Sequence, residues 1–250
     1  MARDSGAIEI AEGVFRIGTD TGRSGLSGFG YLIIDGNECA FIDPGSAVDF
    51  DEVLKQLRLI IEPSRITWII AHNHSADLCS SIPLLEKNGF RGSVVLDWRT
   101  LLVAQHYGIH APYYMLNEHD FALRFASGRI LQFIPAQYLP CAGSVLTFDL
   151  RTKILFSGDL FGAAGVPSSP WADSSYPEAM RQYHEHAMPS RTIMAPLMSR
   201  LLLMDISMIA PHHGAVIKDR LSENIRFLHE LECGGRAASP RKQLGRDGTW

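Results

Sequence analysis

Three apolar segments of the sequence each end at residues that can bind a metal ion. The segments are ITWII at 66–70, KILFSG at 153–158 and ISMIAP at 206–211. Runs of this kind are typical of buried β-strands, and the ends of neighbouring strands meet at one edge of a sheet. The residues of metal-binding type that follow these segments are His72, His74, Asp77, Asp159, His212 and His213.

Imidazole nitrogens and carboxylate oxygens are donors that suit zinc and iron in proteins. Each of the three motifs alone is also common in an ordinary polar loop. Their joint occurrence at strand ends favours a metal site, because rigid neighbouring strands hold ligands in place and buried charges need partners.

The remaining pattern mixes hairpins with alternating strands and helices. Asp35, Gly36 and Asn37 separate two apolar runs and have the chemistry of a hairpin turn. Apolar residues recur at helical spacing over 49–61. Trp68 and Trp98 lie in strand contexts, so both are expected in the core. The arrangement favours a layered α/β sandwich over a purely doubly wound sheet.

The order of the motifs YLIIDGNECAFIDPG, AHNHSAD, FSGD and APHHG resembles the metallo-β-lactamase fold. Within that fold the chain most resembles the diiron domain of flavodiiron proteins and their flavodoxin-free relatives, the oxygen-binding diiron proteins. The resemblance implies a four-layer αββα sandwich over residues 1–233. The segment 234–250, GGRAASPRKQLGRDGTW, is almost without apolar residues and is expected to be a disordered tail.

The resemblance also implies a two-metal site and its ligands. With one residue inserted in the AHNHSAD loop, the metal ligands are His72, His74, Asp77, Asp159 and His213. Without the insertion, Asn73 and Ser75 take the first two ligand positions, which would remove most of that half of the site. The register with the insertion is preferred, because it keeps His72 directly after its strand.

Two positions depart from the family pattern. Pro140 stands where the family has a histidine ligand, so one metal has lost a ligand. Leu78 stands where zinc hydrolases have a second histidine, which argues against hydrolase chemistry. Residues expected beside the ligands or in the pocket are His212, His184, Glu185 and Cys141, of which Cys141 is either a substitute ligand or a structural cysteine.

The function implied by the resemblance is that of a nonhaem iron protein that binds O₂ or a related diatomic such as NO, as a sensor or as a component of a reductase. It implies two iron ions, or one if Pro140 abolishes a position, while zinc would accept the same donors. Electrons for such an oxidoreductase, without its own flavin domain, would come from a separate donor protein. Two other functions stay open: a metal-dependent hydrolase of the metallo-β-lactamase superfamily, and a metal-poor domain kept as a binding module.

The charge, the apolar runs and the cysteines limit the partners and the location that are expected. The formal net charge of -4 gives no basic surplus, which argues against nucleic acid. No apolar run reaches the roughly 18 residues of a membrane span, and MARDSGAIEI lacks the apolar core of a signal peptide. The 4 cysteines occur singly, which favours a reducing, cytoplasmic location. Flavodiiron proteins often pair, so the resemblance also allows a homodimer.

Overall fold

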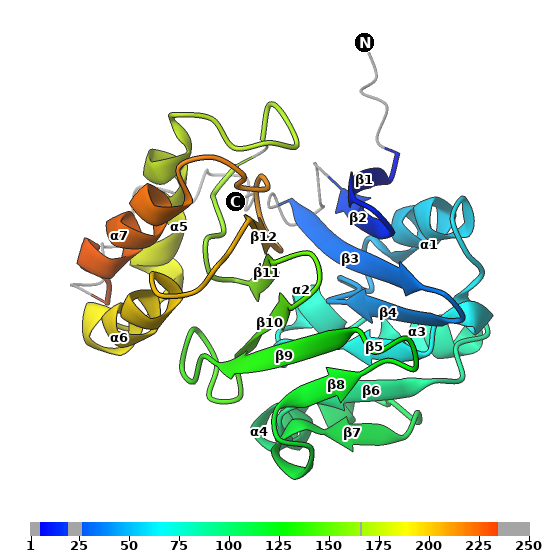
Figure 1. Ribbon diagram of the computed structural model, residues 1–250. Helices are drawn as coiled ribbons and strands as arrows, with labels where there is room; N and C mark the ends of the chain where they lie inside the picture. The colour runs from blue at the N-terminus through cyan, green and yellow to red at the C-terminus, as the bar shows by residue number, and fades with distance from the viewer. Residues whose placement is uncertain (1–5, 20–26, 166, 235–250) are drawn as a thin grey trace, which may run out of the picture.

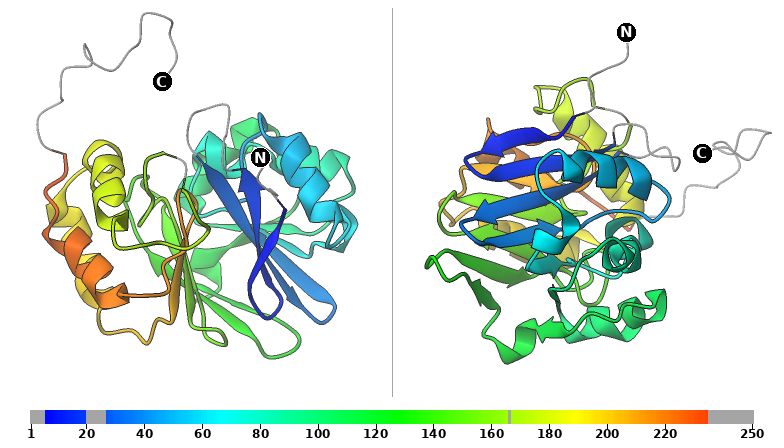
Figure 2. Two further views of the ribbon diagram at one scale, coloured as in Figure 1. Left: turned by 90° about the horizontal axis from the view of Figure 1, so that it is seen from above. Right: turned by 90° about the vertical axis from the view of Figure 1, so that its right-hand side faces the viewer.

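The structure, a computed structural model, describes residues 6–19, 27–165 and 167–234. In it two β-sheets pack face to face and helices cover both outer faces (Figures 1 and 2). The first sheet has the order β1-β2-β3-β4-β5-β6-β7. Its strands are β1 Ile8–Ala11, β2 Val14–Thr19, β3 Gly28–Asp35, β4 Glu38–Ile42, β5 Trp68–Ile70, β6 Ser93–Leu96 and β7 Tyr113–Met115.

The second sheet has the order β12-β11-β10-β9-β8. Its strands are β8 Ala122–Arg124, β9 Ile130–Pro135, β10 Val145–Asp149, β11 Ile154–Gly158 and β12 Met208–Pro211. Strands β4 to β7 pair in parallel, as do β11 and β12, while the other pairs are antiparallel.

Each outer face of the sandwich has its own layer of helices. The helices are α1 Phe50–Arg58, α2 Ala76–Cys79, α3 Ile82–Lys87, α4 Trp98–Ala104, α5 Tyr176–Ala187, α6 Arg191–Leu201 and α7 Leu221–Glu230. Apolar residues of α1, α3 and α4 pack on the first sheet, and those of α5, α6 and α7 pack on the second. A third apolar cluster fills the space between the two sheets. The prediction of a four-layer αββα sandwich is confirmed.

Local sequence explains most of these elements. Gly36 has φ 62° in the β3–β4 turn, a conformation that glycine adopts without a steric penalty. Helix α1 buries Phe50, Val53, Leu54 and Leu57, as its apolar spacing predicts. The expectation for Trp98 is wrong, since this residue begins helix α4 and is 42% exposed. Residues 235–250 of the predicted tail lie outside the described residues.

The strands place the predicted ligands at one end of the sandwich. His72 follows β5 by two residues, Asp159 follows β11 directly, and His212 follows β12 directly. Because β11 and β12 are parallel, their carboxyl ends lie together. Gly158 and Phe161, with φ 56° and 62°, turn the chain sharply on either side of Asp159.

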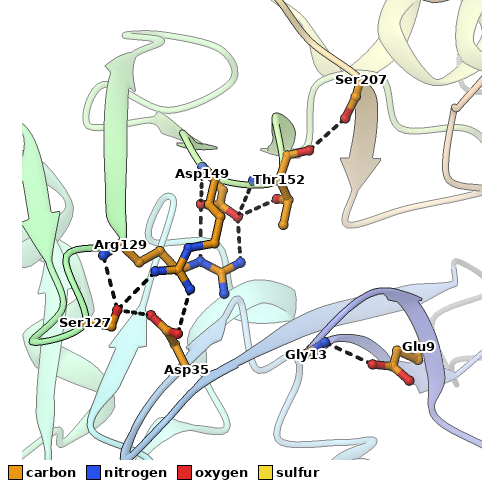
Figure 3. A network of polar contacts seen from close by, with 9 residues as sticks. Glu9, Gly13, Asp35, Ser127, Arg129, Asp149, Thr152 and Ser207 are labelled. Atoms are coloured by element: carbon orange, nitrogen blue, oxygen red, sulfur yellow. Dashed lines mark hydrogen bonds and ion pairs between the residues drawn. The ribbon is translucent and has the colours of Figure 1, made fainter.

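The opposite end of the strands is held by polar contacts between the sheets (Figure 3). Arg129 and Asp149 are both buried, and Arg129 Nη2 lies 2.6 Å from Asp149 Oδ2 while Nε donates to Oδ1 over 3.2 Å. Asp35, at the end of β3, accepts a hydrogen bond of 2.7 Å from Arg151 and another from Ser127. These contacts connect a hairpin of the first sheet to two turns of the second, away from the predicted ligands.

None of the helices in the described part of the chain is long and apolar enough to cross a membrane.

Candidate metal centre

Asp77, His212 and His213 form a cluster of donors that one metal ion could share. Among the described residues, one ligand atom from each of these three lies within 4.8 Å of the others. Asp77 comes from the short helix α2, and the two histidines follow β12. A cavity of about 260 Å³ borders all three side chains. The cluster therefore joins segments that are far apart in the sequence, and it is open to a small molecule.

His213 is oriented by the backbone. Its Nδ1 donates to the carbonyl of Ser27 over 2.6 Å, which leaves Nε2 facing Asp77 Oδ2 at 3.1 Å. A ligand histidine commonly has this arrangement, with its second nitrogen donating to a carbonyl group. Burial lowers the pKa of His213, but the Asp159 and Asp77 carboxylates outweigh burial and raise it to about 10. The Nε2 position thus strongly favours a positive charge.

Asp159 lies beside this cluster, with its carboxylate held by protein groups. Tyr183 donates to Oδ1 over 2.8 Å, and Asn73 Nδ2 donates to Oδ2 over 2.7 Å. His213 Nε2 lies 3.6 Å from Oδ1. Burial raises the pKa of Asp159, but His213, Tyr183 and Asn73 together lower it below its usual range. Asp159 is therefore an anion next to the cluster, and it could share a cation with Asp77 and His213.

His72 is not part of this cluster. Its Nδ1 donates to Asp43 over 2.6 Å, and its Nε2 lies 2.8 Å from the Thr147 hydroxyl. Side chains alternate along a strand, so His72 continues the side of Trp68 and Ile70, which faces the other sheet. Thr147 lies on that sheet, in β10. With both ring nitrogens in hydrogen bonds, His72 is a buried link between the sheets that packs against Gly158 and lies outside the donor cluster.

The other residues of the loop after β5 differ in whether they contact the site. His74 is half-buried, and among the described residues its ring has no hydrogen bond or ion pair with the cluster. Asn73 is the residue that reaches Asp159, as given above. The Ser75 hydroxyl lies 3.9 Å from the sulfur of Cys141. Asn73, Ser75 and Asp77 thus border the site at the positions that the register without the insertion gives to the ligands. This differs from the register with the insertion, which was preferred from the sequence.

Helix α5 places its two predicted residues differently. His184 is fully buried; its Nδ1 donates to the Met180 carbonyl and its Nε2 accepts the Phe161 backbone N–H over 3.1 Å. Burial lowers the pKa of His184 to about 4, so the ring is neutral and supports the turn after Asp159. Glu185 is exposed and lies 3.8 Å from Arg181, so the structure does not bring it to the site.

Four residues around the site were missed in the sequence. Tyr183 forms a hydrogen bond with Asp159, the carbonyl of Ser27 with His213, and Asp43 and Thr147 with His72. Asp43 belongs to the motif IDPG, which could have indicated a site residue. Tyr183 and Thr147 gave no signal, because a tyrosine on a helix and a threonine in a strand are ordinary residues there.

Comparison with protein families identifies the chain. Residues 27–214, well over half of the chain, match the family described as "ODP family beta lactamase". The chain belongs to the ODP family. A curated relative, "Putative diflavin flavoprotein A 1" of Thermosynechococcus vestitus, is 25% identical over 201 residues, which cover 77% of this chain and 34% of that protein. This ODP family chain thus spans about a third of the length of that relative.

Solved structures share the fold of this ODP family member. Rubredoxin oxygen:oxidoreductase from Desulfovibrio gigas has a TM-score of 0.78 at 18% identity, over 90% of this chain and 61% of that chain. The structure described as "Peroxy diiron species of chemotaxis sensor ODP" has a TM-score of 0.76 at 21% identity, over 91% of this chain and 96% of that chain.

The donor set of the site fits one metal position better than two. Asp77 and His213 belong to the donor cluster, and Asp159 lies 3.6 Å from His213, so two carboxylates and an imidazole flank this position, which suits iron or zinc. At the other position, the register without an insertion gives Asn73, Ser75 and Pro140. An amide and a hydroxyl are weak neutral donors, and proline has none in its side chain. The residues present therefore fit one ion at the His213 side of Asp159.

Proposed function

We propose that this protein is a nonhaem iron protein that binds O₂ or a related diatomic such as NO, as a sensor or as the oxygen-binding component of a reductase. The observation that carries the proposal is the cluster of Asp77, His212 and His213 beside a cavity, with Asp159 3.6 Å from His213, in a chain of the ODP family. The relatives described as a diiron chemotaxis sensor and as an oxygen oxidoreductase support iron and a diatomic ligand.

The residues of the site have separate tasks in this proposal. Asp77, Asp159 and His213 would hold the ion, and the Ser27 carbonyl fixes the ring of His213 so that Nε2 points at the carboxylates. The Tyr183 hydroxyl fixes the Asp159 carboxylate. A ferrous ion held there would supply electrons and open coordination positions for a diatomic. The cavity, lined by small residues such as Gly28 and Gly45, leaves room for that ligand.

The site supports a hydrolase less well. Leu78, at the position of the second histidine of zinc hydrolases, is an apolar side chain that is fully buried. A second metal that could activate water together with the first therefore lacks its ligand. For a reductase role, a separate protein would have to donate electrons to the centre.

Loading with iron under nitrogen tests the proposal. The protein is purified without oxygen, loaded with Fe²⁺, and measured by elemental analysis and by electron paramagnetic resonance after addition of NO. We expect bound iron and a new signal with NO. In the matched variant Asp159→Asn, we expect iron affinity to fall at least about tenfold, since a carboxylate of the site is lost. A folded wild-type protein that takes up no iron, or iron that gives no response to NO or O₂, would refute the proposal.

A further inference from the structure

His212 is a buried imidazole without a hydrogen bond. Its side chain is 1% exposed, and neither Nδ1 nor Nε2 has a hydrogen-bond partner among the described residues. Its backbone is satisfied, because its N–H donates to Gly158 and its carbonyl accepts from Phe29. A buried polar group without a partner is costly and rare in folded proteins. A ligand that binds the ring would remove this cost.

The surroundings of His212 place its ring at the metal cluster. Its ring meets that of His213 edge to face, with centroids 4.7 Å apart, and a donor nitrogen lies within 4.8 Å of the donors of Asp77 and His213. Gly28 lies on the cavity side of the ring, and a β-carbon there would be in van der Waals contact with His212 Nε2 at 3.5 Å.

Two imidazoles and one carboxylate form a known kind of donor set. A single ferrous ion bound by two histidines and one carboxylate keeps coordination positions open for oxygen. Asp77, His212 and His213 provide this set. Asp159, 3.6 Å from His213 Nε2, is close enough to act as a further carboxylate.

The far side of Asp159 is closed by the protein itself. Asn73 Nδ2 donates to Asp159 Oδ2 over 2.7 Å, so an amide occupies the carboxylate oxygen that a second ion would need. Ser75 beside it faces the sulfur of Cys141 at 3.9 Å. Nothing in this arrangement of neutral groups supplies the negative charge that stabilises a second cation.

We propose that the centre holds one metal ion instead of two, and that His212 is one of its ligands together with Asp77 and His213. This inference rests on the proposed function only in that a metal is bound; it does not depend on which metal or diatomic. His212 adds a donor to the position of Asp77 and His213, while the position bordered by Asn73, Ser75 and Pro140 lacks ligands.

Cobalt titration of the full chain tests the inference. Co²⁺ is the probe, because its visible absorption reports binding and coordination without O₂ chemistry. We expect the metal-free protein to bind one cobalt ion per chain. In His212→Gln the dissociation constant should rise at least about tenfold, as expected for a lost ligand. The matched control is His186→Gln on the exposed side of helix α5, where the affinity should stay within about twofold of wild type.

Other results of the cobalt titration overturn the inference. Two cobalt ions per chain would contradict a single-ion centre, and equal affinity in His212→Gln would exclude His212 as a ligand. No binding to the wild type would exclude the site. If His212→Gln does not fold, X-ray absorption of the wild-type cobalt protein decides instead, with two imidazoles per cobalt expected and one imidazole contradicting the proposal. A single cobalt with two imidazoles, but no response of the iron-loaded protein to NO or O₂, would leave this inference intact and refute the proposed function.

Discussion

His72 and Asn73 are adjacent in the sequence, and their side chains have opposite surroundings. His72 bonds to Asp43 and Thr147 between the sheets, while Asn73 reaches Asp159 at the site. Replacing His72 by alanine leaves the buried Asp43 carboxylate without its partner and opens a cavity. We therefore expect His72→Ala to lower the free energy of unfolding by about 3 kcal/mol, with an unchanged number of metal ions per folded chain. Urea unfolding and elemental analysis measure the two effects.

The control for this prediction is His74→Ala on the same loop. Because this side chain is half-buried, its loss should lower the free energy of unfolding by less than about 1 kcal/mol. Loss of metal from folded His72→Ala would show that the register with the insertion is correct.

The burial of His72 between the sheets was predictable from the sequence. The hydrogen bond from Asn73 to Asp159 was not. Trp68, Ile70 and His72 share one side of a strand by simple alternation, so a histidine on the side that faces the second sheet is expected to be covered. Which groups cover it depends on β10, whose position relative to β5 is set by the packing of the sheets. His212 was recognised as a neighbour of His213, but its lack of a hydrogen bond appears only in three dimensions.

At the scale of the elements, segments with a clear apolar pattern were predicted correctly, and several short elements without one were missed. Helix α1 and the β3–β4 hairpin follow from apolar spacing and turn residues. Strands β1 and β7 have 4 and 3 residues, and helix α4 has 7, which is too few for a period to be distinguished. Such short elements form because neighbours in the sheet pair with them or cover them.

The turns at the other end of the sandwich depend on one buried ion pair. In Arg129→Met the Asp149 carboxylate stays buried without its cation, and we expect the free energy of unfolding to fall by about 3–5 kcal/mol. Burial raises the pKa of Asp149, but Arg129 and Thr152 outweigh it and lower the pKa. Chemical denaturation measures the loss. The control is Arg151→Met, whose half-exposed pair with Asp35 should contribute less than about 1 kcal/mol. An equal loss in both variants would show that burial is not the cause.

At the scale of the whole molecule, both sheets contribute to the centre. The loop after β5 and helix α2 carry Asn73, Ser75 and Asp77, while the ends of β11 and β12 carry Asp159, His212 and His213. The loop between β9 and β10 brings Cys141 to Ser75, and Pro140 precedes it. A second metal position would therefore need ligands from two separate loops at once, and single substitutions should not create it.

The combined variant Asn73→His, Ser75→Glu and Pro140→His tests this dependence. It removes the amide from Asp159 and places two imidazoles and a carboxylate on the far side of that residue, which are donors that suit a second ion. We expect cobalt bound per chain to rise from one ion to two, while Asn73→His alone stays at one. Elemental analysis after gel filtration counts the ions, and circular dichroism checks that each variant is folded. If the folded triple variant still binds one ion, the missing ligands are not what limits the centre, and the packing of the loops around Asp159 must exclude the second ion.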